Sequence, residues 1–309
     1  MTDPALEFTG ERFTPECVRE IWYEHVHRYA LARPLAAGKR VLDIACGEGY
    51  GSAIVAPVAR AVTGIDLSRE AIAHARARYG LLPNVDFREA DATRFDPGAE
   101  RFDLALSFET LEHVEAQDEL VGGIAAALAD GGCALISSPD KAVYSDAIGY
   151  RNEFHVRELY RDELLALLSR HFRCVRLYGQ RLFFHSTIWA LDGPRAPAAM
   201  QTAHADGRYD NEACAPPTYF IAACAQREAD LPVLPGVALF ADDVESVYDD
   251  YRQETRRNMR ARVVLAEQES ALTATRAALA QAQARILELE SAVAVEARKA
   301  SRFWPFGRK

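Results

Sequence analysis

The chain has 309 residues and a net charge of −9 at pH 7, with 49% hydrophobic and 26% charged residues. At about 100–200 residues per domain, this length predicts about two domains, and the composition excludes a chain that is disordered throughout. The charge is divided unevenly, because residues 252–309 carry 12 Lys and Arg against 6 Asp and Glu, whereas residues 1–251 carry 24 against 39. An acidic body of this kind argues against nucleic acid as a partner.

Three further features of the sequence bear on the cellular location of the protein. No apolar run approaches the length of about 18–20 residues that a membrane-spanning helix needs. Residues 1–16 lack the apolar core of a secretory signal, so no such signal is expected. The six cysteines include no Cys-x-x-Cys pair, so neither a metal site nor a disulfide framework is expected. A reducing cytoplasm is therefore the expected location.

Residues 1–37 are expected to form an N-terminal helical cover, and from Lys39 onward short apolar runs alternate with helical patterns. Strands are predicted at 40–46, 61–66, 85–88, 102–108 and 133–138, and helices at 51–59, 69–79 and 115–129. This alternation predicts an α/β domain, with a parallel sheet covered by helices on both faces. A helix at 161–171 and strands at 175–184 and 219–225 are predicted to follow. The stretch 192–217 is expected to be a long loop, either a substrate wall or a surface insertion.

The C-terminal part has a different pattern. A linker is predicted at 228–237, and residues 237–304 contain neither Pro nor Gly. Apolar residues recur there every seven positions, at Leu265, Leu272, Leu279, Ile286 and Val293. This period predicts an α-helical coiled coil over 238–300, and hence a homo-oligomer. The companion positions Gln268, Thr275, Ala282 and Leu289 are weaker, which leaves two and three strands open, and a single solvated helix is the alternative.

The last residues, 301–309, mix aromatic and basic side chains. Such a tail can contact an anionic membrane surface or a partner protein, or it can be a frayed end.

The sharpest local signal is the sequence VLDIACGEGYG at 41–51, which predicts a buried strand, a glycine-rich turn and the start of a helix. The spacing of Gly47, Gly49 and Gly51 differs from the Gly-x-Gly-x-x-Gly of nicotinamide dehydrogenases. Negative charge at Asp43 and Glu48 would repel a pyrophosphate and suits a cationic ligand. Asp66 ends the second predicted strand and can accept hydrogen bonds from ribose hydroxyls, and Asp91 follows the third, near an expected adenine amine.

These segments resemble the ordered motifs of class I S-adenosylmethionine-dependent methyltransferases. The resemblance covers about residues 38–227 and rests on VLDIACGEGYGS, GIDLS, EADA, FDLALSFETLEHV and ALISSPD. It implies a Rossmann-like, seven-stranded sheet, mostly parallel with an antiparallel last strand. It implies S-adenosylmethionine as cofactor, with Gly47 and Gly49 under its methionine part, Asp43 helping to hold that end, Asp66 on the ribose and Asp91 with Ala92 around the adenine. It further implies cofactor contacts at Ala45, Leu67 and Phe108.

Methyl transfer to a hydroxyl needs a group that accepts the hydroxyl proton, and histidine is suited to that task near neutral pH. His113 follows the fourth predicted strand and His155 the fifth, so both are candidate catalytic residues at the edge where open α/β sheets bind ligands. The alternatives are that His113 caps a helix or packs on the cofactor, and that His155 only fixes its loop. Glu112 and Glu153 are less favoured bases.

Two N-terminal segments, TGERFTP at 9–15 and EHVHRY at 24–29, narrow the resemblance. They are similar to methyltransferases of bacterial surface-polysaccharide (O-antigen) pathways, some of which carry a long C-terminal coiled coil. That resemblance implies that the acceptor is the non-reducing terminal sugar or a phosphate on it, and the absence of a kinase signature favours the sugar. It also implies that methylation ends chain growth, and that the coiled coil spaces the enzyme from a glycosyltransferase or polymerase at the inner face of the plasma membrane. A small-molecule methyltransferase, acting on a quinone or natural product, and a non-catalytic coiled-coil scaffold are the alternatives.

Overall fold

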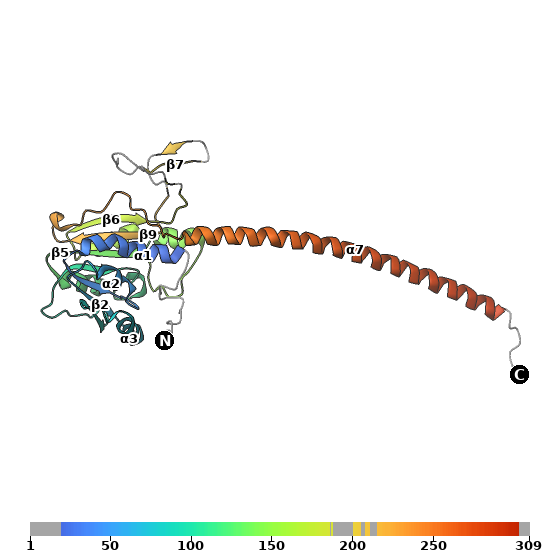
Figure 1. Ribbon diagram of the computed structural model, residues 1–309, viewed down its shortest axis with the longest axis horizontal. Helices are drawn as coiled ribbons and strands as arrows, with labels where there is room; N and C mark the ends of the chain where they lie inside the picture. Colours follow the sequence, from blue (N-terminus) through green and yellow to red (C-terminus); the bar gives the residue numbers. More distant parts are fainter. Residues whose placement is uncertain (1–19, 186, 188–199, 205–207, 211–214, 303–309) are drawn as a thin grey trace. The chain divides into compact units, whose positions relative to one another are not determined.

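The computed structural model describes residues 20–185, 187, 200–204, 208–210 and 215–302. The chain divides into two compact units, the first ending at Val244 and the second beginning at Glu245 (Figure 1). Within the described residues, no helix is both long enough and apolar enough to cross a membrane.

The first unit alternates helices and strands as the sequence predicts. Its N-terminal part comprises α1 (Glu20–Ala32), η1 (Arg33–Ala36), β1 (Arg40–Ile44), α2 (Tyr50–Val55), β2 (Ala61–Asp66), α3 (Arg69–Tyr79) and β3 (Val85–Glu89). Its central part comprises β4 (Phe102–Ser107), η2 (Leu111–His113), α4 (Gln117–Ala127), β5 (Leu128–Pro139), α5 (Lys141–Tyr144), η3 (Asp146–Ile148) and α6 (Arg161–Leu168). The last elements are β6 (Cys174–Gln180), β7 (Thr202–Ala203), β8 (Tyr209–Asp210), β9 (Tyr219–Ala225) and η4 (Glu228–Asp230).

Seven strands form one sheet in the order β3-β2-β1-β4-β5-β9-β6. β1 lies between β2 and β4 and is parallel to both, with Asp43 opposite Gly64 and Leu106. β9 is antiparallel to its two neighbours, β5 and β6. The predicted mostly parallel sheet with an antiparallel last strand is therefore confirmed, and the carboxyl ends of β1 to β5 meet the start of β9 at one edge.

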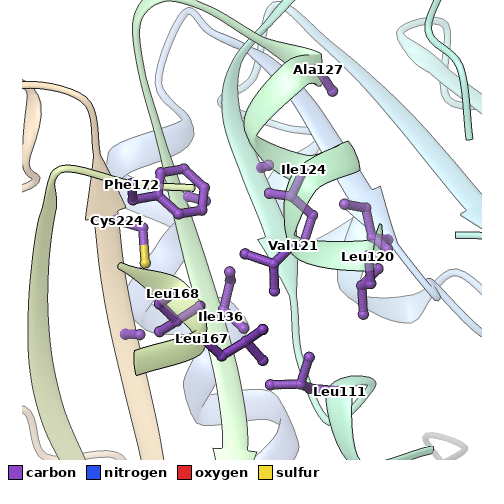
Figure 2. Packing of buried hydrophobic residues seen from close by; sticks show 14 of the residues in the cluster. Leu111, Leu120, Val121, Ile124, Ala127, Ile136, Leu167, Leu168, Phe172 and Cys224 are labelled. Carbon is purple, nitrogen blue, oxygen red and sulfur yellow. The ribbon is translucent and has the colours of Figure 1, made fainter. Parts of the chain in front are cut away.

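Both faces of the sheet are covered, because alternate residues of each strand enter different apolar cores. On one face, Leu42 and Ile136 join buried residues of α4 and α6. Figure 2 shows this core, in which Leu120, Val121 and Ile124 of α4 lie on the same face of the sheet as Leu167 and Phe172. On the other face, Val41 and Leu135 join residues of α1 and α2, among them Tyr29 and Val55. The result is a three-layer domain in which α1 forms part of the outer layer.

Several boundaries differ from those predicted. β5 begins at Leu128, so the residues before Cys133 already pair with β4, and the register shifts between Phe102 and Leu104. α2 ends at Val55, earlier than the predicted 59, and β6 ends at Gln180, earlier than 184. Residues 1–19 of the expected cover and most of the expected loop at 192–217 lie outside the described residues. The short antiparallel pair β7 and β8 lies within the described part of that loop.

The long helix α7 (Ser246–Arg302) forms the second unit and begins later than the predicted 238. The helix begins later because residues 240 and 242 make tertiary contacts with α1. Phe240 stacks on His27 of α1 with ring centroids 5.2 Å apart, and Tyr23 donates a hydrogen bond to Asp242 Oδ1 at 2.8 Å. Glu245 then has a φ of 51°, which interrupts a continuous helix. Residues 238–244 thus belong to the first unit.

Candidate active site

The glycine-rich turn after β1 is held by the end of the neighbouring strand. The N–H of Gly47 donates to Asp66 Oδ2 at 2.9 Å, and the N–H of Ser68 donates to Asp66 Oδ1 at 2.8 Å. Gly49 has a φ of 88°, and a Cβ placed there would lie 2.7 Å from the ring of Phe87. Glycine at position 49 therefore serves both the left-handed turn and close packing. The structure brings the predicted residues Gly47, Gly49 and Asp66 together.

Asp43 lies beneath this turn and is fully buried. Tyr29 Oη donates to its Oδ1 at 2.9 Å, and Ser52 Oγ donates to its Oδ2 at 2.6 Å. Burial raises the pKa of the Asp43 carboxyl to about 6, although the two hydroxyl donors lower it. Asp43 thus ties α1 and α2 to β1. Its predicted role at the methionine end of the cofactor stays a prediction.

Glu48 does not face a ligand, contrary to the expectation from the sequence. It is buried against α3, with Oε2 2.9 Å from His74 Nε2 and 3.4 Å from Arg78 Nη1. The carboxylate inside the glycine-rich turn therefore anchors a helix, and the spacing of the motif alone could not have shown this.

The remaining predicted cofactor residues lie at the ends of β1 to β4. Ala45 has a φ of 54° directly after β1. Leu67, directly after β2, is 71% exposed, an unusual exposure for a leucine beside a buried strand end. Asp91 Oδ1 accepts hydrogen bonds from the N–H and hydroxyl of Thr93, which lower the pKa of the Asp91 carboxyl, and Ala92 packs against the core. Phe108 is buried against Tyr29, with ring centroids 5.0 Å apart. Their roles toward the cofactor remain predictions.

Sequence reasoning missed Arg28. Its side chain is buried on α1, its Nε donates to Gln180 Oε1 at 2.7 Å, and its guanidinium lies 4.5 Å above the ring of Tyr219. Nη2 forms an ion pair with Glu109 Oε1 at 3.5 Å, but neither terminal nitrogen has a hydrogen-bond partner among the described residues. A buried guanidinium with unused donors is suited to a carboxylate.

The methionine part of S-adenosylmethionine carries such a carboxylate. Arg28, the turn at Gly47 and the Asp66 carboxylate therefore fit this cofactor. A second carboxyl group, that of Glu24, lies near Arg28 and accepts a hydrogen bond from Tyr219 Oη at 3.1 Å. Burial raises the pKa of the Glu24 carboxyl to about 7. The local signal in the sequence was a single arginine within the aromatic helix EIWYEHVHRYALA. The partners of Arg28 come from β6, from β9 and from the turn after β4, which no local pattern connects to α1.

The two predicted catalytic histidines lie side by side. The rings of His113 and His155 are perpendicular, with centroids 4.9 Å apart. His113 Nδ1 is 3.0 Å from the carbonyl oxygen of Phe154, and His155 Nδ1 is 2.6 Å from Glu158 Oε1. Glu112 is buried beside them, whereas Glu153 is exposed.

A strained turn at Glu109 brings the histidine-bearing segment to this edge. Glu109 follows β4 by two residues and has a φ of 50°. Its N–H donates to Ser137 Oγ of β5 at 3.0 Å, and Ser137 Oγ donates back to Glu109 Oε1 at 2.7 Å. These contacts fix the turn that leads into η2 and His113.

The sheet order, the glycine-rich turn after β1 and the acidic residues at the end of β2 and after β3 define an S-adenosylmethionine-dependent methyltransferase. A family model described as "Methyltransferase domain" matches residues 16–187. A probable S-adenosylmethionine-dependent methyltransferase of Mycolicibacterium smegmatis is 32% identical over 247 residues, which cover 77% of this chain and 92% of that protein. The chain belongs to this methyltransferase family, and its cofactor is S-adenosylmethionine.

Two further similarities are more limited. A ubiquinone biosynthesis O-methyltransferase of Aromatoleum aromaticum is 39% identical over 104 residues, which cover 33% of this chain and 44% of that protein. The crystal structure of the N-methyltransferase NodS of Bradyrhizobium japonicum with S-adenosyl-L-homocysteine is 18% identical, with a TM-score of 0.45, and the match covers 67% of this chain and 87% of that one.

Proposed function

We propose that this methyltransferase acts on a hydroxyl group of the non-reducing terminal sugar of a bacterial surface polysaccharide (O-antigen), and so ends chain growth. The observation that carries the proposal is the second unit: a single helix of 57 residues, α7, follows the methyltransferase domain. An enzyme that methylates a small acceptor has no evident use for such a helix. In an enzyme that ends chain growth, the helix can set the distance between the methyltransferase domain and a polymerase.

The chain's own residues divide the work between the two substrates. S-adenosylmethionine, when bound, supplies a methyl group that is already activated, so alignment is the main requirement. Asp66 holds the glycine-rich turn in shape, and Arg28 offers donors for a carboxylate. We place the acceptor hydroxyl beside His113 and His155, where Nε2 of an imidazole can take the hydroxyl proton.

We further propose that α7 assembles with other copies of the chain. The five residues of its seven-residue repeat are between 50% and 68% exposed in the single chain: Leu265, Leu272, Leu279, Ile286 and Val293. An apolar stripe of this period is what a second α7 would bury. In this proposal the assembly stands at the inner face of the plasma membrane, near a glycosyltransferase or polymerase. The aromatic and basic tail invoked for membrane contact was predicted at 301–309; its first two residues end α7, and residues 303–309 lie outside the described residues.

A second candidate function is methylation of a small quinone precursor or natural product. The name of the Aromatoleum aromaticum relative, a ubiquinone biosynthesis O-methyltransferase, favours it. The two candidates share the cofactor and the hydroxyl chemistry, and they differ in the size of the acceptor.

The test is methyl transfer from labelled S-adenosylmethionine by the full-length protein. The two acceptors are surface polysaccharide with unmethylated ends and a dihydroxylated quinone precursor. We expect label at the polysaccharide ends, and none with the Asp66→Ala variant. Label in the quinone precursor alone would overturn the polysaccharide proposal in favour of the second candidate.

A further inference from the structure

Glu112, His113 and His155 form a compact set of potential metal ligands. One donor atom from each lies within 4.8 Å of the other two. Neighbouring ligands about 2.1 Å from a metal ion are about 3.0–3.4 Å apart, so the separations between these atoms would have to shorten by up to about 1.4–1.8 Å. Glu112 and His113 lie on η2, and His155 lies on the loop between η3 and α6, so two separate segments supply the set.

Both histidines are oriented as metal-binding histidines are. The partner of His113 Nδ1 is the carbonyl oxygen of Phe154, at 3.0 Å, and the partner of His155 Nδ1 is the carboxylate of Glu158, at 2.6 Å. Carbonyl and carboxylate oxygens only accept hydrogen bonds, so in a neutral imidazole each Nδ1 carries the proton and Nε2 carries the lone pair. In metal sites, an acceptor that holds the Nδ1 proton of a histidine orients Nε2 toward the metal ion, and the Phe154 carbonyl oxygen and the Glu158 carboxylate are placed to do this.

Glu112 supplies an independent observation. It is 1% exposed, and neither carboxyl oxygen has a hydrogen-bond partner among the described residues. Its Oε1 is 3.9 Å from His113 Nε2, too far for a hydrogen bond. A buried carboxyl group without a hydrogen bond is costly, and a cation between Glu112 and the two imidazoles would remove that cost.

We propose that Glu112, His113 and His155 bind one divalent transition-metal ion, and that this ion positions the acceptor hydroxyl. Two imidazoles and one carboxylate suit ions such as Zn²⁺, Mn²⁺ and Co²⁺ and leave coordination positions open. The inference rests on the proposed function in one respect, since it assigns the open positions to the acceptor oxygen. It also departs from the absence of a metal site expected from the sequence, because these ligands come together only in the fold.

Binding of the ion changes one hydrogen bond of the protein and the acidity of the acceptor. Asn152 Nδ2 donates to His155 Nε2 at 3.0 Å, and metal binding replaces this hydrogen bond. With the ion bound, both Nε2 atoms are ligands, so neither imidazole takes the hydroxyl proton. The ion instead lowers the pKa of the bound hydroxyl, which loses its proton to solvent. In the transfer, the acceptor oxygen forms a bond to the methyl carbon, the carbon–sulfur bond breaks, and its electron pair stays on sulfur. No oxidant or reductant is needed.

The direct test is titration of the chelator-treated, full-length protein with Co²⁺, followed by calorimetry and by visible absorption. We expect one Co²⁺ per chain, and binding at least about 10-fold weaker in Glu112→Gln and in His155→Asn. The matched control is His171→Asn, because His171 also pairs with a carboxylate, Asp118 at 3.0 Å, but lies outside the cluster. That control should bind Co²⁺ as the unchanged protein does.

Two results would overturn the metal site: no binding at millimolar Co²⁺, or equal binding by the unchanged protein and both cluster variants. Circular dichroism and the melting temperature report whether each variant folds, and His113→Asn replaces Glu112→Gln if the latter does not. The titration contains neither methyl donor nor acceptor, so failure of the polysaccharide to accept label leaves its outcome unaffected. Conversely, label transfer to the polysaccharide that persists with excess chelator would overturn the positioning role and leave the proposed function standing.

Discussion

Asp66 performs two tasks with one carboxylate. Each oxygen accepts a backbone N–H, from Gly47 across the neighbouring strand and from Ser68 just beyond β2. A carboxylate oxygen has a second lone pair, so both atoms can still accept a hydrogen bond from a ligand hydroxyl. We therefore expect Asp66 to couple the shape of the glycine-rich turn to the binding of a ribose, the role that the sequence predicts for it.

We expect Asp66→Ala to abolish cofactor binding, measured by calorimetric titration with S-adenosylhomocysteine. The variant loses the predicted ribose acceptor and leaves two backbone N–H groups unpaired, each at a cost of about 1–3 kcal/mol. Asp86→Ala is the matched control, because Asp86 lies on the adjacent β3 with its side chain 58% exposed. Unchanged affinity in Asp66→Ala would show that the cofactor binds elsewhere.

Asp43 predicts a pH dependence of stability. Burial raises its pKa from 3.8 to about 6. As the pH rises from about 4 to about 6, the unfolded chain ionises at Asp43 while the folded chain stays protonated, so folding stability falls. The loss is up to about 3 kcal/mol for about two pKa units, and it is complete above the folded pKa.

Urea unfolding at pH 4 and at pH 7 tests this expectation against the Asp43→Asn variant. Because other carboxyl groups titrate in both proteins, the relevant quantity is the difference in unfolding free energy between them. We expect the unchanged protein to lose stability relative to Asp43→Asn as the pH rises. A difference that stays constant with pH would contradict the assignment of the titration to Asp43.

At the scale of elements, the sequence predicted what local patterns control. α3 has the predicted bounds because Ser68 caps its first turn, accepting from the N–H of Ala71 at 3.2 Å, and because apolar residues at helical spacing bury one face. β2 and β9 also match, since each is a short, buried run. The predicted start of the long helix, at residue 238, was wrong because the contact of Phe240 with α1 competes with helix formation. Arg28 was missed for the same reason, since its partners are distant in sequence.

The seven-residue stripe of α7 can be tested within the element. We expect Leu272→Glu with Leu279→Glu to abolish self-association, measured by light scattering, and to lower the helical signal in circular dichroism, because charge in an apolar seam prevents burial. Ser270→Glu with Ala277→Glu is the matched control, since it adds the same charge at the same spacing but outside the repeat. Equal association of both double variants would contradict a seam on this face.

For the whole molecule, the first unit ends at Val244, so a truncation that keeps this unit intact should be made there and not at residue 238, where the coiled coil was predicted to begin. We expect a chain truncated after Val244 to be a folded monomer that still binds S-adenosylhomocysteine, measured by light scattering and calorimetry. A chain truncated after Val237 should also be monomeric but should melt at a lower temperature, because it loses the contacts of Phe240 with Trp22 and His27. Each aromatic pair contributes about 0.5–1.5 kcal/mol beyond its buried area. A truncated chain that still associates would place the assembly surface in the first unit.

Gly51, the third glycine of the turn, has a consequence for how this domain can be divided or recombined. A Cβ at position 51 would lie 2.0 Å from the ring of Tyr29, the residue that donates a hydrogen bond to the buried Asp43. α1 and the glycine-rich turn are therefore packed as one unit, although 21 residues, which include η1 and β1, separate Tyr29 from Gly51 in the chain. A graft of the first 37 residues onto another methyltransferase domain would succeed only where the recipient also has glycine at the third position. The N-terminal segment is thus not an interchangeable module.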